Sequence, residues 1–411
     1  MNSRERVLAA INHDPVDRIP IDFGGHRSSG IMAMAYARLK KYLGISSGDI
    51  YVYDMPQQLA IVEPEIMELL GVDVIEMGRG FLLDDAAWKE WILPDGTPCK
   101  IPQYINVEER SGDWYLLADD GRVLAVQKKG TPFMEHIHFP MADRDFEHDD
   151  FSDLAEQFKY SMWTGVATPG GHLALNEDGL MKLTTGAEKL RESTDKAIVG
   201  LFGGNMFEIP QYLYRMDNYL TYMGLYPEAI LRLSEKLYEL HLNNLEKWLG
   251  AVGDYIDVIL FGDDFGTQTG PFMSTEMYRE YYKPYQQKLW KRTKELADVK
   301  IMLHSCGGIE PLLDDLIDAG LEAVNPVQIS CNGMDPKLLK EKYGSRMCFW
   351  GGGCDTRDIL PHQSPEEVGR HVRKQVEIMQ KGSGFVFQQV HNIMADIRPE
   401  NIMALFKAVN Q

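Results

Sequence analysis

The sequence lacks long apolar runs and has few cysteines. No stretch of about 18 residues is apolar and free of charge, and residues 1–15 contain no continuous apolar segment like that of a signal peptide. We therefore expect no membrane span and a cytoplasmic location. The 5 cysteines are too few, and odd in number, for a disulfide framework in a chain of 411 residues. Reduced thiols are expected, and some are candidate metal ligands.

Basic residues are scarce relative to acidic ones. The chain has 42 Lys and Arg against 61 Asp and Glu, a net charge of -19, and its basic residues form no cluster. A phosphate backbone would be repelled by such a protein, which argues against nucleic acid as a partner. With 44% hydrophobic and 25% charged residues, the composition is that of a folded globular protein, which we interpret as one domain over residues 1–411.

What the sequence does contain is a repeated alternation of short apolar runs and longer amphipathic stretches. Four of these stretches predict helices, over residues 227–252, 274–297, 309–320 and 364–382. The alternation predicts an α/β fold of the (β/α)8 TIM-barrel type. In the eight runs predicted as strands the apolar part is followed by Gly, Asp, Asn or His. The runs cover residues 18–26, 72–78, 197–205, 255–264, 299–308, 321–328, 346–356 and 384–392.

Residues 80–140 interrupt this alternation. Short alternating segments are separated there by PDG, SGD and DDG, which are typical turn sequences. They predict a small antiparallel β meander inserted after the second strand. Such an insertion would lie at the carboxyl end of the barrel, where active sites of this fold are built.

Polar residues follow nearly every predicted strand and would converge on one mouth of the barrel. Asp263 and Asp264 are candidate catalytic acids or bases, and because they are adjacent, one can face the mouth while the other caps a helix. The candidate substrate-binding residues are His26, Arg27, Asn205, Gln268, Asn325 and Gln328.

His304 and Cys306 form a His-x-Cys pair at the end of the fifth run. Side chains two residues apart in a strand point the same way, and zinc prefers imidazole nitrogen and thiolate sulfur. A catalytic zinc keeps three protein ligands and one open position. The pair predicts such a site, and the third ligand is either Cys354 or His391.

Four segments together resemble the uroporphyrinogen decarboxylase superfamily, which includes methylcobamide-dependent methyltransferases. They are "MNSRERVLAAINHDPVDRIPIDFG", "YIDVILFGDDFGTQTGPFMS", "LHSCGGIEPLLDDLIDAGLEAVNPVQ" and "HNIMADIRPENIMAL", and they span nearly the whole chain. The resemblance implies a TIM-type barrel, and members of the superfamily often pair as dimers, so a homodimer is expected.

The sequence resembles the methyltransferase branch more than the decarboxylase proper. The decarboxylase carries "RQAGR" after its first strand and "FSD" after its second, where this chain has "FGGHRSSG" and "IEMGRG". The methyltransferases carry His-x-Cys after the fifth strand, which His304 and Cys306 match, and a further Cys at the eighth strand. Here that position is His391, so Cys354 is the compensating candidate.

The resemblance implies a zinc-dependent enzyme that moves a methyl group between a corrinoid and a small thiol, ether or amine. The chain shows no "DxHxxG" corrinoid-binding signature, so the cobalamin would arrive on a partner protein. Two alternatives stay open. One is a uroporphyrinogen decarboxylase-like enzyme of porphyrin metabolism, and the other is a non-catalytic barrel that binds a tetrapyrrole or corrinoid.

Overall fold

A curled, fully parallel sheet of seven strands forms the centre of the molecule. The computed structural model describes residues 1–78, 85–163 and 172–411. The strands stand in the order β15-β14-β13-β12-β11-β10-β3. Each strand therefore pairs with the strands of this sheet that come before and after it in the chain. Their bounds are β3 (Val74–Glu76), β10 (Ala197–Gly203), β11 (Val258–Gly262), β12 (Lys300–His304), β13 (Ala323–Asn325), β14 (Cys348–Trp350) and β15 (Phe385–Val386). Each lies inside a run predicted as a strand, and the α/β class is confirmed.

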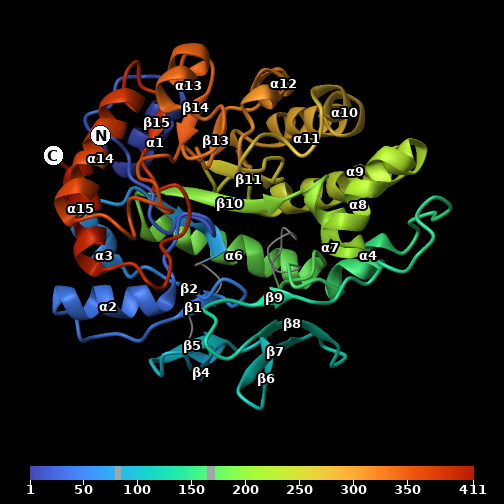
Figure 1. Cartoon of the computed structure of the whole chain (residues 1–411), viewed down its shortest axis with the longest axis horizontal. Coiled ribbons are helices and arrows are strands. Elements are labelled where there is room, and N and C mark those ends of the chain that lie inside the picture. Colours follow the sequence, from blue (N-terminus) through green and yellow to red (C-terminus); the bar gives the residue numbers. More distant parts are fainter. Residues whose placement is uncertain (79–84, 164–171) are drawn as a thin grey trace.

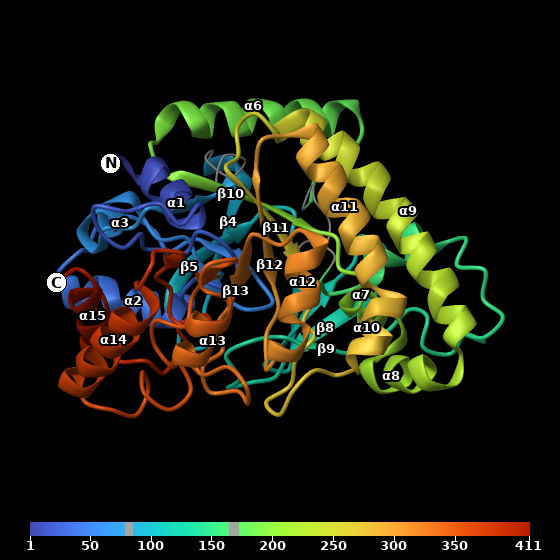
Figure 2. The same cartoon turned by 90° about the horizontal axis from the view of Figure 1, so that it is seen from above.

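Helices cover the outside of this sheet, as Figure 2 shows from above. The helix α9 packs between α6 and α11, and its buried residues recur every three or four positions, from Ile230 and Leu233 to Leu237 and His241. In chain order the helices are α1 (Ser3–Ile11), α2 (Ala33–Leu43), α3 (Pro64–Leu70), α4 (Leu154–Gln157), α6 (Glu177–Ser193), α7 (Glu208–Tyr214), α8 (Met216–Leu225), α9 (Pro227–Val252), α10 (Thr275–Tyr281), α11 (Lys283–Leu296), α12 (Leu313–Ala319), α13 (Pro336–Tyr343), α14 (Pro365–Met379) and α15 (Pro399–Val409). No helix in the described ranges has the length and apolar content to span a bilayer.

One predicted helix is two helices in the structure. The stretch 274–297 divides into α10 and α11 at Tyr282, whose φ of -127° is not helical. Pro284 follows at the start of α11. Proline has no N–H to donate and restricts the residue before it, so it is tolerated in a first helical turn but not inside a continuous helix.

The first predicted strand, residues 18–26, is reduced to a single bridge. Ile21 pairs in parallel with Phe387, just beyond β15. On its other side, the carbonyl of Ile21 accepts the N–H of Asp73, just before β3. The segment therefore lies between the two edge strands of the sheet. The glycines at 24 and 25 follow Ile21 closely, and Gly24 has a φ of 78°, so extended backbone ends there.

A repeated carboxylate arrangement holds the amino ends of the strands. Asp73, Asp257 and Glu322 each stand directly before a strand, and each donates its N–H to the carbonyl of an isoleucine in the preceding strand segment. The N–H groups of those isoleucines donate back to the three carboxylates at 2.9, 2.8 and 2.8 Å. At each of the three positions, the acidic residue and the isoleucine thus exchange two hydrogen bonds. These bonds fix the register of neighbouring strands.

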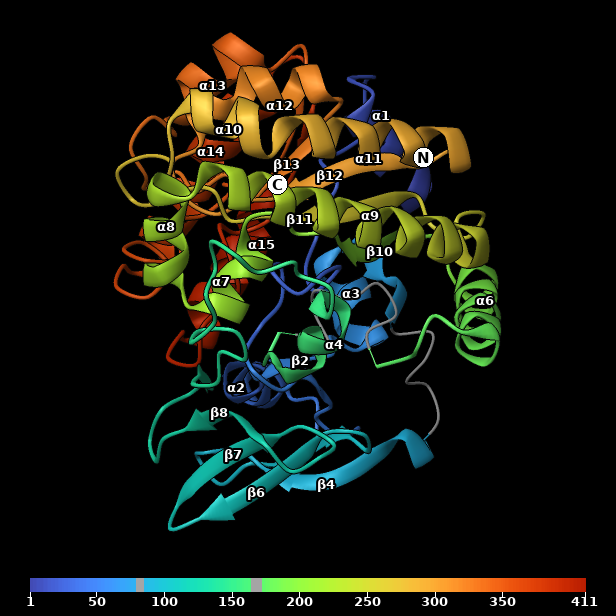
Figure 3. The same cartoon turned by 90° about the vertical axis from the view of Figure 1, so that its right-hand side faces the viewer.

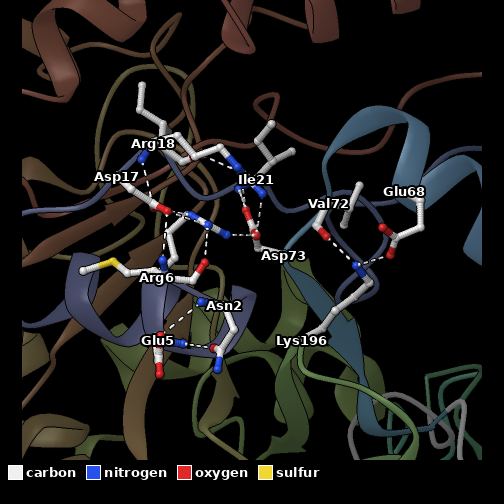
Figure 4. A network of polar contacts seen from close by, with 12 residues as sticks. Asn2, Glu5, Arg6, Asp17, Arg18, Ile21, Glu68, Val72, Asp73 and Lys196 are labelled. Carbon is white, nitrogen blue, oxygen red and sulfur yellow. Dashed lines mark hydrogen bonds and ion pairs between the residues drawn. The ribbon is translucent and has the colours of Figure 1, made fainter.

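Arginines complete the first of these arrangements, which Figure 4 shows from close by. Asp73 is fully buried and accepts from Arg6 at 2.7 Å and from Arg18 at 2.6 and 2.8 Å. Arg6 also reaches Asp17 at 2.7 and 2.9 Å. The network ties α1 and the segment before Ile21 to the start of β3.

Antiparallel strands occupy the region between β3 and β10, away from most of the helices (Figures 1 and 3). They form two small sheets, a β4-β5 hairpin and a four-stranded β6-β7-β8-β9 meander. Residues 80–84 of the expected insertion lie outside the described residues. The strands are β4 (Trp88–Ile92), β5 (Pro98–Pro102), β6 (Asn106–Arg110), β7 (Asp113–Leu117), β8 (Val123–Gln127) and β9 (Glu135–His136), and a further pair is β1 (Val52–Asp54) with β2 (Leu59–Ala60).

Candidate metal centre and adjoining cavity

The end of β12 brings two potential metal ligands together with a third from the loop after β15. His304 is the last residue of β12 and Cys306 follows two positions later. The Sγ of Cys306 lies 3.4 Å from Nε2 of His304. One ligand atom from each of His304, Cys306 and His391 lies within 4.8 Å of the other two. Three donors of these kinds, so close together, suit a zinc ion with one open position.

Asn325 fixes the orientation of the His304 ring. Its Oδ1 lies 2.7 Å from Nδ1 of His304, and its Nδ2 donates to the carbonyl of Trp350 and to Oε1 of Gln388. Because both amide hydrogens are used, Oδ1 faces the imidazole as an acceptor. His304 then carries its proton on Nδ1 and directs the lone pair of Nε2 toward Cys306, the tautomer that a metal ligand needs.

Burial keeps the three side chains uncharged. It lowers the pKa of His391 to about 3 and lowers the pKa of His304, so both imidazoles are neutral donors at physiological pH. Burial and the nearby Asp264 raise the pKa of the Cys306 thiol. A bound cation would reverse that effect, because a coordinating thiol loses its proton to the metal. The donor set therefore fits zinc.

Cys354 lies apart from this group. Its side chain is fully buried, and its Sγ faces the carbonyl of Asp355 at 3.6 Å. Burial raises the pKa of its thiol. Of the two candidates for a third ligand, it is His391 whose donor atom lies near those of His304 and Cys306.

The two adjacent aspartates after β11 have different surroundings. Asp263 is fully buried and accepts the backbone N–H groups of Met206, Phe207 and Glu208 at 2.9, 2.8 and 3.0 Å. It thus caps the start of α7, although burial still raises its pKa to about 7. Asp264 accepts the N–H of Cys306 at 2.7 Å, and its Oδ1 lies 3.6 Å from Nε2 of His304.

A cavity of about 160 Å³ opens beside the three candidate ligands. Its walls are the carboxyl ends of β10 and β11, and both His304 and His391 face it together with Asp264. Arg27 and Asn205, two of the residues predicted to bind substrate, line it as well. Arg27 forms an ion pair of 2.9 Å with Asp54 and also lines a second cavity, of about 450 Å³, against β7 and the loop after β5.

The other residues predicted to bind substrate have other contacts. His26 is buried with Nε2 at 3.2 Å from a carboxylate oxygen of Asp22. Gln268 is exposed and accepts from Arg357 at 3.3 Å, and Gln328 accepts the N–H of Gly307 at 2.6 Å. Asn325 acts on His304 as described above. None of these four side chains lines the cavity in the described part of the chain.

Sequence reasoning missed Glu208, whose carboxyl group also lines the cavity. It accepts a hydrogen bond from Tyr212 and one from Asn205, each at 2.6 Å. Burial and the neighbouring carboxylates raise its pKa to about 8. The available signal was its position three residues after Asn205, at the first turn of the helix that follows β10.

Comparison with known proteins places this chain in a family. The family model "Uroporphyrinogen decarboxylase (URO-D)" matches residues 176–411, a range that includes His304, Cys306 and His391. The chain belongs to the URO-D family. A uroporphyrinogen decarboxylase of Methylococcus capsulatus is 25% identical over 177 residues, covering 41% of this chain and 47% of that protein. The chain thus matches about half the length of this curated relative.

Among solved structures, a methyltransferase from Methanosarcina mazei has a similar fold. The two structures superpose with a TM-score of 0.58 at 16% sequence identity, covering 100% of this chain and 98% of the other. This chain and the methyltransferase therefore share a fold over nearly their full lengths. At this identity the similarity concerns the fold alone.

Proposed function

We propose that this protein is a zinc-dependent methyltransferase that moves a methyl group between a corrinoid on a carrier protein and a small thiol, ether or amine. The observation that supports it is the grouping of His304, Cys306 and His391 within 4.8 Å, beside a cavity. The similarity in fold to a methyltransferase is consistent with this proposal.

In this proposal the three residues hold zinc, and the fourth position stays open to the substrate. Zinc supplies Lewis acidity, which stabilises negative charge on a sulfur or oxygen atom. Asn325 keeps Nε2 of His304 directed at the ion, and Asp264 holds the backbone of Cys306 in place through its N–H group. A substrate bound in the cavity beside them would lie next to His304 and His391, which line it.

We further propose that the sheet closes into a (β/α)8 barrel through the segment around Ile21, with one domain over residues 1–411. Hydrogen bonds link this segment to Phe387 on one side and to Asp73 on the other, which supports the closure. The antiparallel strands after β3 are then an insertion at the barrel mouth, and their second cavity meets the first at Arg27. The corrinoid carrier approaches this open face.

Decarboxylation of a porphyrinogen is the second candidate, because a curated relative carries that name. Arginines that bind a tetrapyrrole must be available to its carboxylates. Arg27, the arginine of the described residues that faces the cavity, is held by Asp54 at 2.9 Å and lies 3.9 Å from Glu76. A guanidinium balanced by two carboxylates attracts a further carboxylate poorly, which favours the methyltransferase.

Metal analysis of protein purified without added zinc tests the proposal. We expect about one zinc per chain in the wild type. Removing a donor as His304→Ala, Cys306→Ala or His391→Ala should abolish or strongly reduce bound zinc, because two remaining ligands hold the ion weakly. Cys354→Ser should retain it, since that thiol lies outside the group of donors.

His362→Ala is the matched control, because it removes an exposed imidazole far from the donors in sequence and leaves the site intact. Methyl transfer is then followed with a methylated corrinoid protein as donor. Absence of zinc from the wild-type protein, or zinc that persists in both His304→Ala and Cys306→Ala, would contradict the proposal. Zinc without methyl transfer to or from any small molecule would favour a binding protein.

A further inference from the structure

Glu208 presents a carboxyl group to the cavity in a fixed orientation. Its Oε1 accepts the hydroxyl of Tyr212 and its Oε2 accepts the amide of Asn205, each at 2.6 Å. Tyr212 and Asn205 line the same cavity, as do His304 and His391. The carboxyl group therefore stands among the groups that would surround a substrate, although it is not one of the grouped metal donors.

The helix that begins at Glu208 gives this carboxyl group little help as an anion. The positive end of a helix stabilises a carboxylate when its free N–H groups donate to it. At the start of α7 the N–H groups of Met206, Phe207 and Glu208 all donate to Asp263 instead. Glu208 is left with one hydroxyl and one amide as donors.

The charges around Glu208 also favour its neutral form. Asp263 and Asp264 face it from the loop after β11, and Tyr212 and Cys306 keep their own protons, because burial raises the pKa of both groups. Arg27 across the cavity is paired with Asp54, and the imidazoles of His304 and His391 are neutral. No Lys or Arg of the described ranges forms an ion pair with Glu208. In the metal-free protein its pKa is raised to about 8, so most of the carboxyl groups carry a proton at neutral pH.

We propose that Glu208 is the proton donor of this site and that the substrate is a methyl ether, which is demethylated. This inference rests on the proposed function and gives the direction of methyl transfer, from the ether to the corrinoid. The electron pair of the carrier's corrinoid forms the new bond to the methyl carbon. The pair of the broken carbon–oxygen bond stays on the oxygen, which takes the proton of Glu208. The products are an alcohol or phenol and the Glu208 carboxylate, which regains a proton from water.

The need for a proton distinguishes an ether from the other substrate classes. An alkoxide or phenoxide is a strong base and leaves poorly unless it is protonated, whereas a thiolate, with a thiol pKa of about 8.5, leaves without help. Methylation of a thiol would need no proton from the protein, because a thiol bound to zinc gives up its own proton, and a protonated carboxyl group would have no part in that direction. The protonated state of Glu208 therefore favours an ether as methyl donor.

The test compares the full-length, zinc-loaded wild type with Glu208→Gln, which keeps the size and polarity of the side chain. The probes are anisoles with para substituents of graded electron withdrawal, with cob(I)alamin as the acceptor. We expect demethylation of anisole to fall by about 10²- to 10⁴-fold in the variant. The loss should shrink as the leaving phenol becomes more acidic, because a weakly basic leaving group needs no proton. A merely structural role would slow all anisoles alike.

An infrared titration locates the proton without any turnover. The difference spectrum between wild type and Glu208→Gln should contain a protonated-carboxyl band at neutral pH that disappears above about pH 8. Glu188→Gln in α6 is the matched control, because that side chain is exposed, and it should change neither the band nor the demethylation rate.

The outcomes separate this inference from the proposed function. A Glu208 that is ionised at neutral pH, or an equal loss for all anisoles, overturns the inference. A wild type that binds zinc and methylates thiols but demethylates no anisole overturns it as well, and leaves the proposed function standing. A wild type that binds no zinc overturns the proposed function, and the infrared titration still decides where the proton lies.

Discussion

Asn325 is the residue that holds the ring of His304 in the orientation that the proposed zinc site requires. Replacing it as Asn325→Leu removes the acceptor at 2.7 Å from Nδ1, so the ring is free to rotate and to change tautomer. We expect zinc affinity to fall by about 10- to 100-fold, as is usual when the partner of a ligating histidine is lost. Competition with a chelator measures it.

The variant also removes two donors, to Trp350 and to Gln388, so thermal unfolding of the metal-free proteins has to be compared as well. Asn332→Ala, an exposed site, is the control and should leave zinc affinity unchanged. If Asn325→Leu binds zinc as tightly as the wild type, Asn325 does not orient His304.

For single residues, the sequence predicted which residue types form the site better than it predicted which residues contact one another. The His-x-Cys spacing placed His304 and Cys306 together, because side chains two apart share one face of a strand. The choice between His391 and Cys354 depends on how two loops fold, which no spacing encodes. Glu208 was missed for the same reason. Its role depends on Asp263, in the loop after the next strand, which accepts the N–H groups at the start of the helix that Glu208 begins.

At the scale of the elements, the carboxylates before β3, β11 and β13 fix the register of neighbouring strands. Asp73 is fully buried between two arginines and also accepts the N–H of Ile21. In Asp73→Asn, Arg18 loses its counter-charge and Arg6 keeps only that of Asp17, while both stay at least partly buried. We expect the free energy of unfolding to fall by about 3–5 kcal/mol. Urea denaturation followed by circular dichroism measures it.

A surface pair is the matched control for that variant. Asp178 forms an ion pair with Lys182 one helical turn away in α6, and its side chain is 66% exposed. Asp178→Asn should change the free energy of unfolding by less than about 0.5 kcal/mol, since exposed pairs contribute little. Equal effects of Asp73→Asn and Asp178→Asn would show that the buried network does not stabilise the strand register.

The elements themselves were largely predictable. Strands buried on both faces are continuous apolar runs, and seven of the eight runs are strands of one sheet. The failures were local: glycines shortened the first strand to a bridge, and Pro284 divided a helix. The carboxylates had a signal of their own, because "DVI" begins at the aspartate directly before both β3 and β11. Its meaning depends on hydrogen bonds between segments far apart in the chain.

For the whole molecule, buried neutral histidines predict loss of stability in mild acid. His241 is buried beneath β10, where desolvation lowers its pKa to about 4. In the unfolded chain the imidazole takes up a proton near its usual pKa of about 6.5. Between these two values the unfolded state binds more protons, so stability is complete above pH 6.5 and declines as the pH falls toward 4. A shift of this size corresponds to roughly 3 kcal/mol at most for this one side chain.

His241→Gln isolates that contribution. Glutamine retains a polar group near the carbonyl of Asn205, which lies 3.3 Å from Nε2 of His241, but it does not titrate. The variant should be less stable than the wild type at neutral pH, because a buried site is repacked. Its loss of stability between neutral pH and about pH 4 should nevertheless be smaller than that of the wild type by roughly 3 kcal/mol at most. Urea unfolding at a series of pH values measures both slopes. Parallel slopes would mean that His241 binds its proton equally well in the folded protein, and that acid sensitivity arises at other buried groups.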